Sequence, residues 1–267
     1  PVNIREKAQM TPEFLKISPG HKIPAIVDHD PPGGGAPVSV FESGAILQYL
    51  AEKTGRFLPK DLRGKHEVLQ WLNWQMGGLG PMAGQANHFN VYAPQFTPVE
   101  ALKYGQDRYS NEVNRLFGVL NKRLADREFI AGSYSIADMA IFPWLRNWQN
   151  QGIDWADYPH LKHWFDTIAA RPAVQRGVQV LADLRKPCRN AGGFTCAADD
   201  DRVVLVDLDA LGMPQLARSD LLEFQPCLLG NHTTASEHCD VFKHLLAAIA
   251  EARRLHGAAF DNAAQQI

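Results

Sequence analysis

The chain has 267 residues, of which 45% are hydrophobic and 21% are charged, and its formal net charge is −2. This composition is typical of a soluble globular protein with room for two domains. The nearly neutral charge argues against general binding to nucleic acid or to anionic membranes, and no apolar run approaches the roughly 18 residues that a membrane-spanning helix needs. Because no signal peptide opens the chain, we expect a cytoplasmic protein without nucleic-acid or membrane partners.

The first residues predict a short strand and then a short helix. The apolar pattern of residues 1–4 favours the strand. Thr11 is a suitable N-cap, because its side-chain oxygen can accept a hydrogen bond from a backbone N–H of the first helical turn. Pro12 suits the first helical position, where its missing N–H would have no partner in any case.

A hairpin comes next, followed directly by a helix start. Residues 25–29 and 38–41 are short apolar runs, and the turn-rich sequence PPGGG lies between them. Ser43 is predicted to be the N-cap of the following helix, whose free backbone amides could bind an anion. The Ile23–Pro24 bond precedes the first strand, and spacing alone predicts a trans bond, since only about 5–6% of X–Pro bonds are cis.

Helical patterns dominate from residue 65 onward. Three glycines and a proline at residues 77–81 interrupt the first of these helices, which predicts a kink or a close backbone approach. A long helix is predicted over residues 98–124. A capping box formed by Ser135 and Asp138 opens the next helix, and we assign it to folding and not to chemistry. Further short helices are predicted to start at two later Tyr-Pro and Arg-Pro pairs.

Several of these motifs, in this order, resemble those of the glutathione transferases. The stretches SPGHKIPAIVD and FESGAILQYLAEKTG resemble the second half of the thioredoxin-like domain of that family. The stretch LQWLNWQMGGLGPMAGQANHFN, with NKRL and YSIADMAIFPW, is similar to the bacterial Nu-class transferases, which are described as glutathione-dependent disulfide-bond oxidoreductases. The resemblance covers residues 1–187. It implies that the Ile23–Pro24 bond is cis, with the residue before the proline offering its backbone N–H and C=O to the cysteinyl unit of glutathione.

The resemblance implies an α/β plus all-α fold in three parts. These are a partial thioredoxin-like glutathione-binding domain at residues 1–57, an all-helical C-terminal transferase domain at residues 65–187, and an extension of unknown fold, or without stable order, at residues 188–267. In the family, a strand, a turn and a helix precede the strand at residues 1–4, and the turn carries the group that activates the glutathione sulfur. We therefore expect a fragment or a relative that has given up catalysis, with unpaired edges on its first two strands, and no catalytic residue is assigned.

Seven positions match the family's glutathione contacts: Gln9, Lys22, Ile23, Pro24, Glu42, Ser43 and Arg108. Gln9 and Lys22 match the glycyl end of the ligand, whose carboxylate the lysine could neutralise. Glu42 can pair with the γ-glutamyl ammonium while Ser43 and the helix start bind its carboxylate. Arg108 can grip a carboxylate in two places.

Five of these matches also have a structural alternative. Gln9 and Lys22 could be ordinary surface side chains, and the Glu42–Ser43 pair could be a plain helix cap. Arg108 could be an i to i+4 partner of Glu112.

Four further residues are candidates for the pocket of the second substrate: Met82, His88, Phe89 and Tyr92. The family places the kinked helix beside the glutathione sulfur, which motivates this assignment. The alternative is that these side chains are packing residues at the end of a helix. His88 is not proposed as a base, because no charge partner stands beside it in the sequence.

The four cysteines all lie in the last third of the chain: Cys188, Cys196, Cys227 and Cys239. Thiol chemistry in residues 1–187 would therefore need a sulfur that arrives with a ligand, which agrees with glutathione as cosubstrate. A metal site could be imagined from the last two cysteines with His232 and His238. Because no CxxC pair is present and the spacing fits no standard site, no metal is predicted.

Two functions are compatible with the sequence. The first is a glutathione transferase or glutathione-dependent disulfide reductase that acts on a small electrophilic or disulfide substrate, in a homodimer. The alternative is a noncatalytic glutathione-binding or protein-interaction relative that uses the same fold as a dimerisation scaffold.

Overall fold

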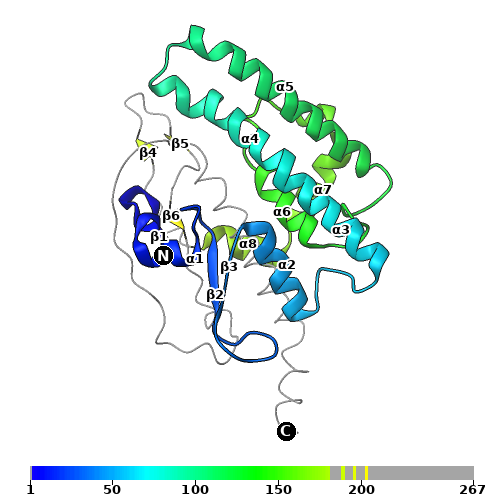
Figure 1. Cartoon of the computed structure of the whole chain (residues 1–267). Helices are drawn as coiled ribbons and strands as arrows, with labels where there is room; N and C mark the ends of the chain where they lie inside the picture. Colours follow the sequence, from blue (N-terminus) through cyan, green and yellow to red (C-terminus); the bar gives the residue numbers. More distant parts are fainter. Residues whose placement is uncertain (1, 181–187, 190–194, 197–201, 204–267) are drawn as a thin grey trace.

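The computed structural model describes residues 2–180, 188–189, 195–196 and 202–203 (Figure 1). A small α/β part comes first in the chain and a larger helical part follows. The α/β part contains these elements: β1 (Val2–Asn3), η1 (Ile4–Glu6), η2 (Ala8–Met10), α1 (Pro12–Ile17), β2 (Ala25–Asp28), β3 (Val38–Phe41) and α2 (Ser43–Thr54). Three two-residue strands follow the helical part: β4 (Cys188–Arg189), β5 (Thr195–Cys196) and β6 (Arg202–Val203).

The predicted hairpin is confirmed. β2 and β3 pair antiparallel, with Ala25 opposite Phe41 and Asp28 opposite Val38. In the loop between them, Gly33, Gly34 and Gly35 all have positive φ, a conformation that only glycine adopts readily. The Thr11 cap is confirmed too, since its Oγ1 accepts a hydrogen bond from the Phe14 N–H at 3.3 Å.

The prediction that the first strand has no neighbour is wrong. β1 pairs antiparallel with β6, so that Val2 lies opposite Val203. β6 falls within the extension, and β4 and β5 form a further antiparallel pair there. Among the described residues, the partner of β2 is β3. The end of the predicted helical domain, residues 181–187, and most of the extension, with Cys227, His232, His238 and Cys239, lie outside the described residues.

The helical part consists of α3 (Leu62–Trp74), η3 (Gln75–Leu79), α4 (Gly80–Asn87), η4 (His88–Tyr92), η5 (Ala93–Gln95), α5 (Val99–Arg123), α6 (Ile136–Leu145), η6 (Trp155–Asp157), α7 (Pro159–Ala169) and α8 (Pro172–Gln179). Its first helix starts at Leu62, because Asp61 caps α3 by accepting a hydrogen bond from the Gly64 N–H at 2.8 Å. The predicted interruption in the first helix is a π-helix, η3. A second π-helix, η4, follows α4 and was not predicted.

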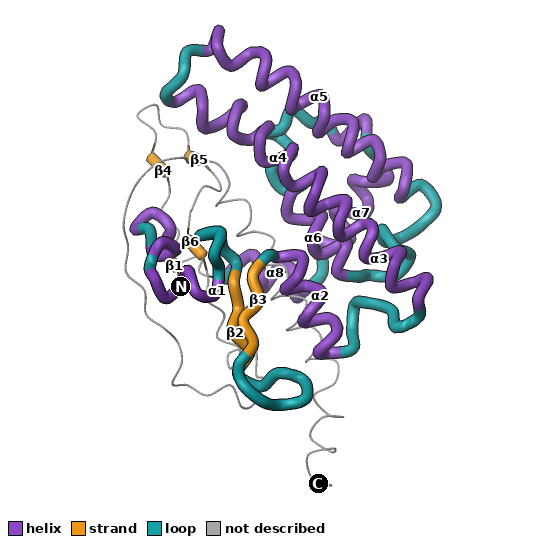
Figure 2. Tube along the Cα trace, viewed as in Figure 1, coloured by secondary structure: helices purple, strands orange, loops and turns teal. Residues whose placement is uncertain are grey.

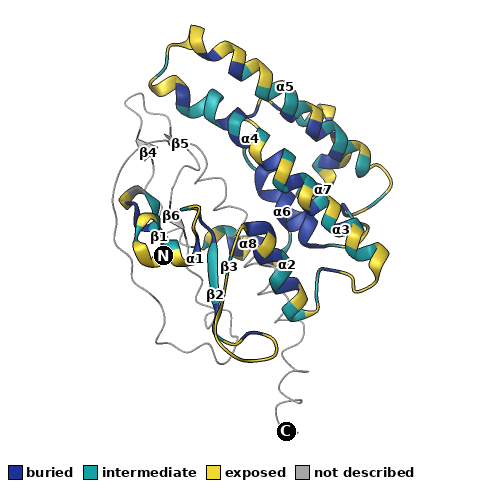
Figure 3. Ribbon diagram, viewed as in Figure 1, coloured by how far each residue is buried: buried dark blue, intermediate teal, exposed yellow. Residues whose placement is uncertain are grey.

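All ten residues of α6 are buried, and this helix forms the centre of the main core (Figure 3). The predicted capping box at its start is confirmed. The Asp138 carboxylate accepts hydrogen bonds from the backbone N–H groups of Ile130 and Ser135, from Ser135 Oγ and from Trp164 Nε1, all at 2.9–3.0 Å. Asp138 therefore ties three separate segments of the domain together.

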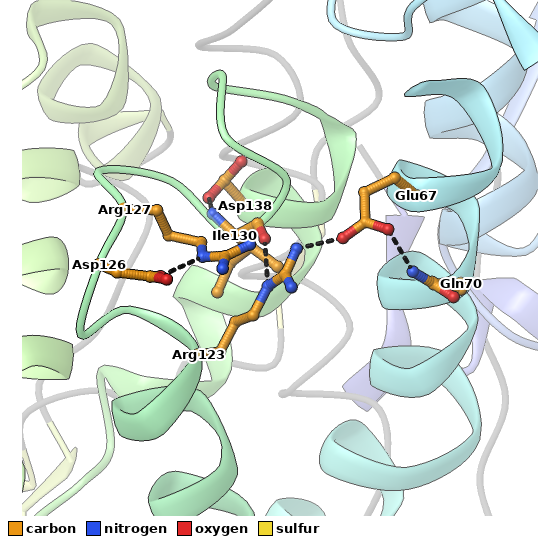
Figure 4. A network of polar contacts seen from close by, with 7 residues as sticks. All are labelled: Glu67, Gln70, Arg123, Asp126, Arg127, Ile130 and Asp138. Atoms are coloured by element: carbon orange, nitrogen blue, oxygen red, sulfur yellow. Dashed lines mark hydrogen bonds and ion pairs between the residues drawn. The ribbon is translucent and has the colours of Figure 1, made fainter. Parts of the chain in front are cut away.

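Arg123 at the end of α5 links this centre to α3 (Figure 4). Its Nε donates to the Ile130 carbonyl at 2.8 Å, its Nη2 pairs with Glu67, and its guanidinium lies over the Trp71 ring, 5.1 Å from the centroid. The Ile130 N–H is one of the donors to Asp138, so this network continues into the capping box. It stabilises the fold and lies within the helical part.

Within the described part of the chain, most buried apolar residues fall into two clusters. The main cluster extends from α2 into α3, α4, α5, α6 and α7, so most of α2 packs with the helical part. A small second cluster contains Val2, Ala8, Phe14 and Ile23. Ile26 and Val40 of the hairpin pack against the main cluster and Ala25 against the small one, so the hairpin contacts two cores of very different size.

Within the described residues, no helix combines the length and the apolar composition needed to cross a lipid bilayer.

Candidate functional site

The Ile23–Pro24 bond is cis. The trans bond predicted from spacing is therefore wrong, and the cis bond implied by the family resemblance is confirmed. The turn before it is fixed by a hydrogen bond from Ser18 Oγ to the Lys22 carbonyl at 2.6 Å. Ile23 is 3% exposed and packs in the small cluster with Phe14.

The pairing of the hairpin brings the cis-proline turn and the start of α2 together. Ala25 lies opposite Phe41, so Pro24 and Glu42, one residue further along each strand, leave the ladder at the same end. This end of the hairpin is where β3 runs into α2 (Figure 2). Because the ladder begins at Ala25, the main chain of Ile23 lies beyond it, at the end of the hairpin where α2 starts.

The start of α2 differs from the prediction in one respect. The helix already includes Ser43, and the N-cap position is Glu42, with φ 69° and ψ 119° and no side-chain capping hydrogen bond. The predicted N-cap role of Ser43 is therefore wrong: the hydroxyl donates instead to Met76 Sδ, at 3.7 Å. The Ile46 N–H bonds to the Glu42 carbonyl, and the amides before it have no acceptor within the helix. Such amides can bind an anion.

A charged cluster that the sequence did not indicate anchors α2 to the hairpin. Asp28, which is buried, accepts hydrogen bonds from Tyr49 Oη and Lys53 Nζ, both at 2.6 Å, and from the Asp30 N–H at 3.0 Å. Burial alone would raise the pKa of Asp28, but these donors outweigh it, and the pKa is lowered. Burial and the neighbouring Asp28 raise the pKa of Tyr49.

The other predicted glutathione contacts lie around this centre in different environments. Gln9, in η2, is partly buried, and its Oε1 has no hydrogen-bond partner within the described part of the chain. Lys22 and Glu42 are exposed beside the turn and the helix start. Arg108 is exposed on α5. Arg115 binds the Glu112 carboxylate through two hydrogen bonds of 2.7–2.8 Å, and the charge of Arg108 also helps to lower the pKa of Glu112, which agrees with the alternative that Arg108 is a helical partner of Glu112.

The candidates for the second-substrate pocket cluster around α4 and η4. Met82 packs against the main core. His88 and Phe89 form an edge-to-face pair with centroids 5.3 Å apart, and Phe89 stacks on Tyr109 of α5 at 5.4 Å. Burial lowers the pKa of His88, which favours the neutral ring. Tyr92 closes η4 and is partly buried. These contacts include the packing that the alternative describes, and the pocket remains a prediction.

The described residues contain no group of three or more His, Cys, Asp or Glu side chains arranged to hold a metal ion.

A hairpin entered through a cis-proline turn and continued into a helix start, with an all-helical domain after it, defines a thioredoxin-like domain joined to a transferase-type helical domain. This is the class of fold that the sequence predicted.

Comparison with known proteins identifies the family. Residues 1–52 match the model of the glutathione S-transferase N-terminal domain, and residues 84–172 match that of the C-terminal domain. The disulfide-bond oxidoreductase YfcG of Escherichia coli is 54% identical over 174 residues, which are 65% of this chain and 79% of that protein. The disulfide-bond oxidoreductase YghU of the same organism is 40% identical over 184 residues, covering 66% of this chain and 61% of that protein. The chain belongs to the glutathione S-transferase family.

Solved structures of glutathione transferases agree with this family assignment. A glutathione transferase of Burkholderia graminis, crystallised with two glutathione molecules per subunit, matches with a TM-score of 0.62 and 43% identity over 67% of this chain and 76% of that one. A glutathione transferase of Pseudomonas putida with one bound glutathione disulfide per subunit matches with a TM-score of 0.63 and 43% identity, covering 67% of this chain and 79% of the other.

Proposed function

We propose that this protein binds glutathione across the cis-proline turn and the start of α2 and serves glutathione-dependent disulfide reduction or transfer. The observation that carries the proposal is the shared end of the hairpin, where the cis Ile23–Pro24 bond and the uncapped start of α2 meet. The YfcG and YghU proteins, both named disulfide-bond oxidoreductases, support the choice of reaction.

The residues fit the ligand in three places. The main chain of Ile23 would bond the cysteinyl unit in the manner of an added strand. The first-turn amides of α2 and the Ser43 hydroxyl would bind the γ-glutamyl carboxylate, and the Glu42 carboxylate would pair with the adjacent ammonium. At the glycyl end, Lys22 would contact the carboxylate and Gln9 would lie nearby. Arg108, Met82, His88, Phe89 and Tyr92 remain proposed contacts to glutathione or to the second substrate.

The sulfur chemistry would come from glutathione, because residues 1–187 contain no cysteine. One glutathione thiolate attacks a sulfur of the disulfide substrate, which forms a mixed disulfide and releases one thiol. A second glutathione thiolate then attacks the mixed disulfide, which yields glutathione disulfide and the second thiol. The reaction consumes two glutathione molecules for each disulfide reduced.

We propose further that the thioredoxin-like unit spans residues 1–57 and the helical unit residues 65–187, and that the protein acts as a cytoplasmic homodimer. The family membership supports the two units.

Two measurements test the function. Titration calorimetry of the full chain with glutathione should show binding, and the absence of heat at millimolar ligand would exclude the site. Turnover is then measured with 2-hydroxyethyl disulfide and glutathione, coupled to glutathione reductase and NADPH. Turnover above the uncatalysed rate supports an oxidoreductase, whereas binding without turnover would favour the noncatalytic alternative.

A further inference from the structure

Met76 lies where the helical part meets the start of α2, and neither the sequence patterns nor the comparisons assign it a role. We propose that Met76 is a positioning residue for the γ-glutamyl carboxylate of glutathione. Its thioether accepts from the Ser43 hydroxyl until the ligand takes over that bond, and its side chain packs against the first turn of α2, so that both stay in place to donate to the ligand. This inference rests on the proposed function and adds to it a residue from the other domain.

Two contacts carry the argument. Ser43 Oγ donates a hydrogen bond to Met76 Sδ at 3.7 Å, and Ser43 is only 2% exposed. At the next residue, a Cβ added to Gly44 would lie 3.0 Å from Met76 Cγ and 3.2 Å from Sδ. The side chain of Met76 therefore lies directly against the backbone of the helix start that would bind the carboxylate.

The chemistry of the thioether suits this role. Sulfur is a weak hydrogen-bond acceptor, so it can hold the Ser43 hydroxyl in one orientation without holding it firmly. A carboxylate is a much stronger acceptor, and hydrogen bonds to charged groups are roughly twice as strong as neutral ones. Ser43 can thus exchange its bond to Met76 for one to the ligand at little cost.

Gly44, on the α2 side of the contact with Met76, also supports the positioning role of Met76. Within a helix, alanine is more favourable than glycine by about 1 kcal/mol, so local propensity alone would favour a side chain at this position. A Cβ there would crowd Met76, whose side chain would have to shift by a few tenths of an ångström. The glycine and the methionine therefore act as a pair.

The π-helix η3 holds Met76 in place. Its wide turn is closed by a hydrogen bond from the Gly80 N–H to the Gln75 carbonyl. Gln75, the neighbour of Met76, is 1% exposed and packs with Trp144 around the position of the missing Gly80 Cβ. A π-helix within an α-helical run is frequent at functional sites, and here it turns one residue into the core and the next toward α2.

The test compares two ligands on each variant. One is glutathione, and the other is 4-aminobutyryl-cysteinylglycine, which is glutathione without the γ-glutamyl carboxylate. In Met76→Leu, which keeps the volume but not the sulfur, and in Gly44→Ala, which displaces Met76, we expect the Kd for glutathione to rise about fivefold or more. The Kd for the analogue should change less than about twofold, because it lacks the group that Met76 serves.

Matched controls are Met139→Leu, a buried methionine of α6, and Gly118→Ala, a helical glycine whose added Cβ would meet nothing within 4 Å. Both should leave the two Kd values unchanged. Circular dichroism and the Tm check that each variant folds. Equal weakening of both ligands in Met76→Leu would indicate a structural role only, and unchanged binding in that variant would refute the proposal. A wild-type chain that binds neither ligand refutes the proposed function itself.

Discussion

Glu42 has a backbone conformation that a residue with a side chain rarely adopts. Its φ of 69° and ψ of 119° place it outside the regions that L-residues occupy easily, at a cost of about 1–3 kcal/mol. Glycine would adopt this conformation with less strain. The side chain of Glu42 is exposed at the start of α2, so packing does not explain its presence there. The proposed pairing of its carboxylate with the γ-glutamyl ammonium of glutathione would explain it.

Replacement of Glu42 by glycine should therefore have opposite effects on stability and binding. We expect Glu42→Gly to raise the free energy of unfolding by about 1 kcal/mol, measured by urea denaturation, because the strain is relieved. The same variant should bind glutathione about tenfold more weakly by calorimetry, because the partner of the ammonium is lost. Glu42→Gln is the control: it keeps the strain and should lose only affinity. Unchanged affinity in both variants would remove Glu42 from the site.

Asp138 offers a prediction about stability alone. In Asp138→Ala, the buried donors of Ile130, Ser135 and Trp164 lose their acceptor, and each such loss costs about 1–3 kcal/mol. We expect the free energy of unfolding to fall by about 3 kcal/mol or more, measured by urea denaturation. Asp166→Ala, which removes an exposed carboxylate, is the comparison and should cost less than about 1 kcal/mol. A similar small loss in Asp138→Ala would contradict the structural role of the capping box.

At the scale of elements, the joint between the hairpin and α2 depends on one ionised group. Asp28 accepts from Tyr49 and Lys53, two residues on one face of α2, and the Lys53 ammonium also donates to the Asp30 carbonyl at 2.5 Å. The two halves of the proposed glutathione site lie on these two elements. Their relative position is therefore sensitive to the charge of Asp28.

Because the contact between the hairpin and α2 depends on ionised Asp28, we expect the stability of the fold to depend on pH. The pKa of Asp28 in the folded protein is below its ordinary value of 3.8, so the stabilisation is fully present above that value and is lost as the pH falls through the folded pKa. Urea unfolding of wild type between pH 6 and about pH 2 should show this loss. Asp28→Asn should be less stable by about 1–3 kcal/mol at pH 6, and the difference should shrink in acid. If the stability difference between wild type and Asp28→Asn stayed constant between pH 6 and about pH 2, the proposed role of the Asp28 charge would be wrong.

The sequence predicted the secondary-structure elements and their caps better than it predicted side-chain contacts between distant parts of the chain. Local chemistry sufficed for the Thr11 cap, the hairpin and the capping box of Ser135 and Asp138, because each depends on residues a few positions apart. The motif resemblance supplied the cis Ile23–Pro24 bond, which spacing alone had assigned wrongly. The bonds of Ser43 to Met76 and of Asp28 to Lys53 join residues 33 and 25 positions apart, and no local pattern encodes them.

The strand pairing shows the same limit. β1 was predicted to lack a neighbour, but its partner β6 lies about 200 residues further along the chain. The π-helix η4 was missed because its apolar pattern resembles that of an ordinary helix end. Glu42 was proposed from its residue type and motif, whereas its backbone strain depends on how β3 enters α2 and could not be predicted locally.

At the scale of the whole molecule, the proposed site lies between two cores of unequal size. Ile23 belongs to the small cluster with Val2, Ala8 and Phe14, whereas the buried face of α2 belongs to the main cluster. Regions that bury few apolar groups open locally at a lower free energy than the main core. The cis-proline half of the site should therefore open more often than the helix-start half.

Hydrogen exchange followed by mass spectrometry can test this difference. Amides in peptides from residues 2–24 should exchange faster than those in α2 and α6 in the protein without ligand. Saturating glutathione should slow exchange in residues 18–28 most, because binding stabilises the closed form by mass action. Equal protection of both halves without ligand would show that the small cluster is as stable as the main core.

The two π-helices in the run from α3 to η4 make the number of residues in that run as important as their identity. Successive residues in an α-helix are separated by about 100° around its axis. Deleting one residue from Gln75–Leu79 would convert the wide turn into an ordinary one and leave the flanking helices facing the same neighbours, whereas deleting one residue from α3 or α4 would swing everything on one side of it around by that angle. Relatives or engineered variants should therefore tolerate a one-residue deletion within η3 better than one in either adjoining α-helix.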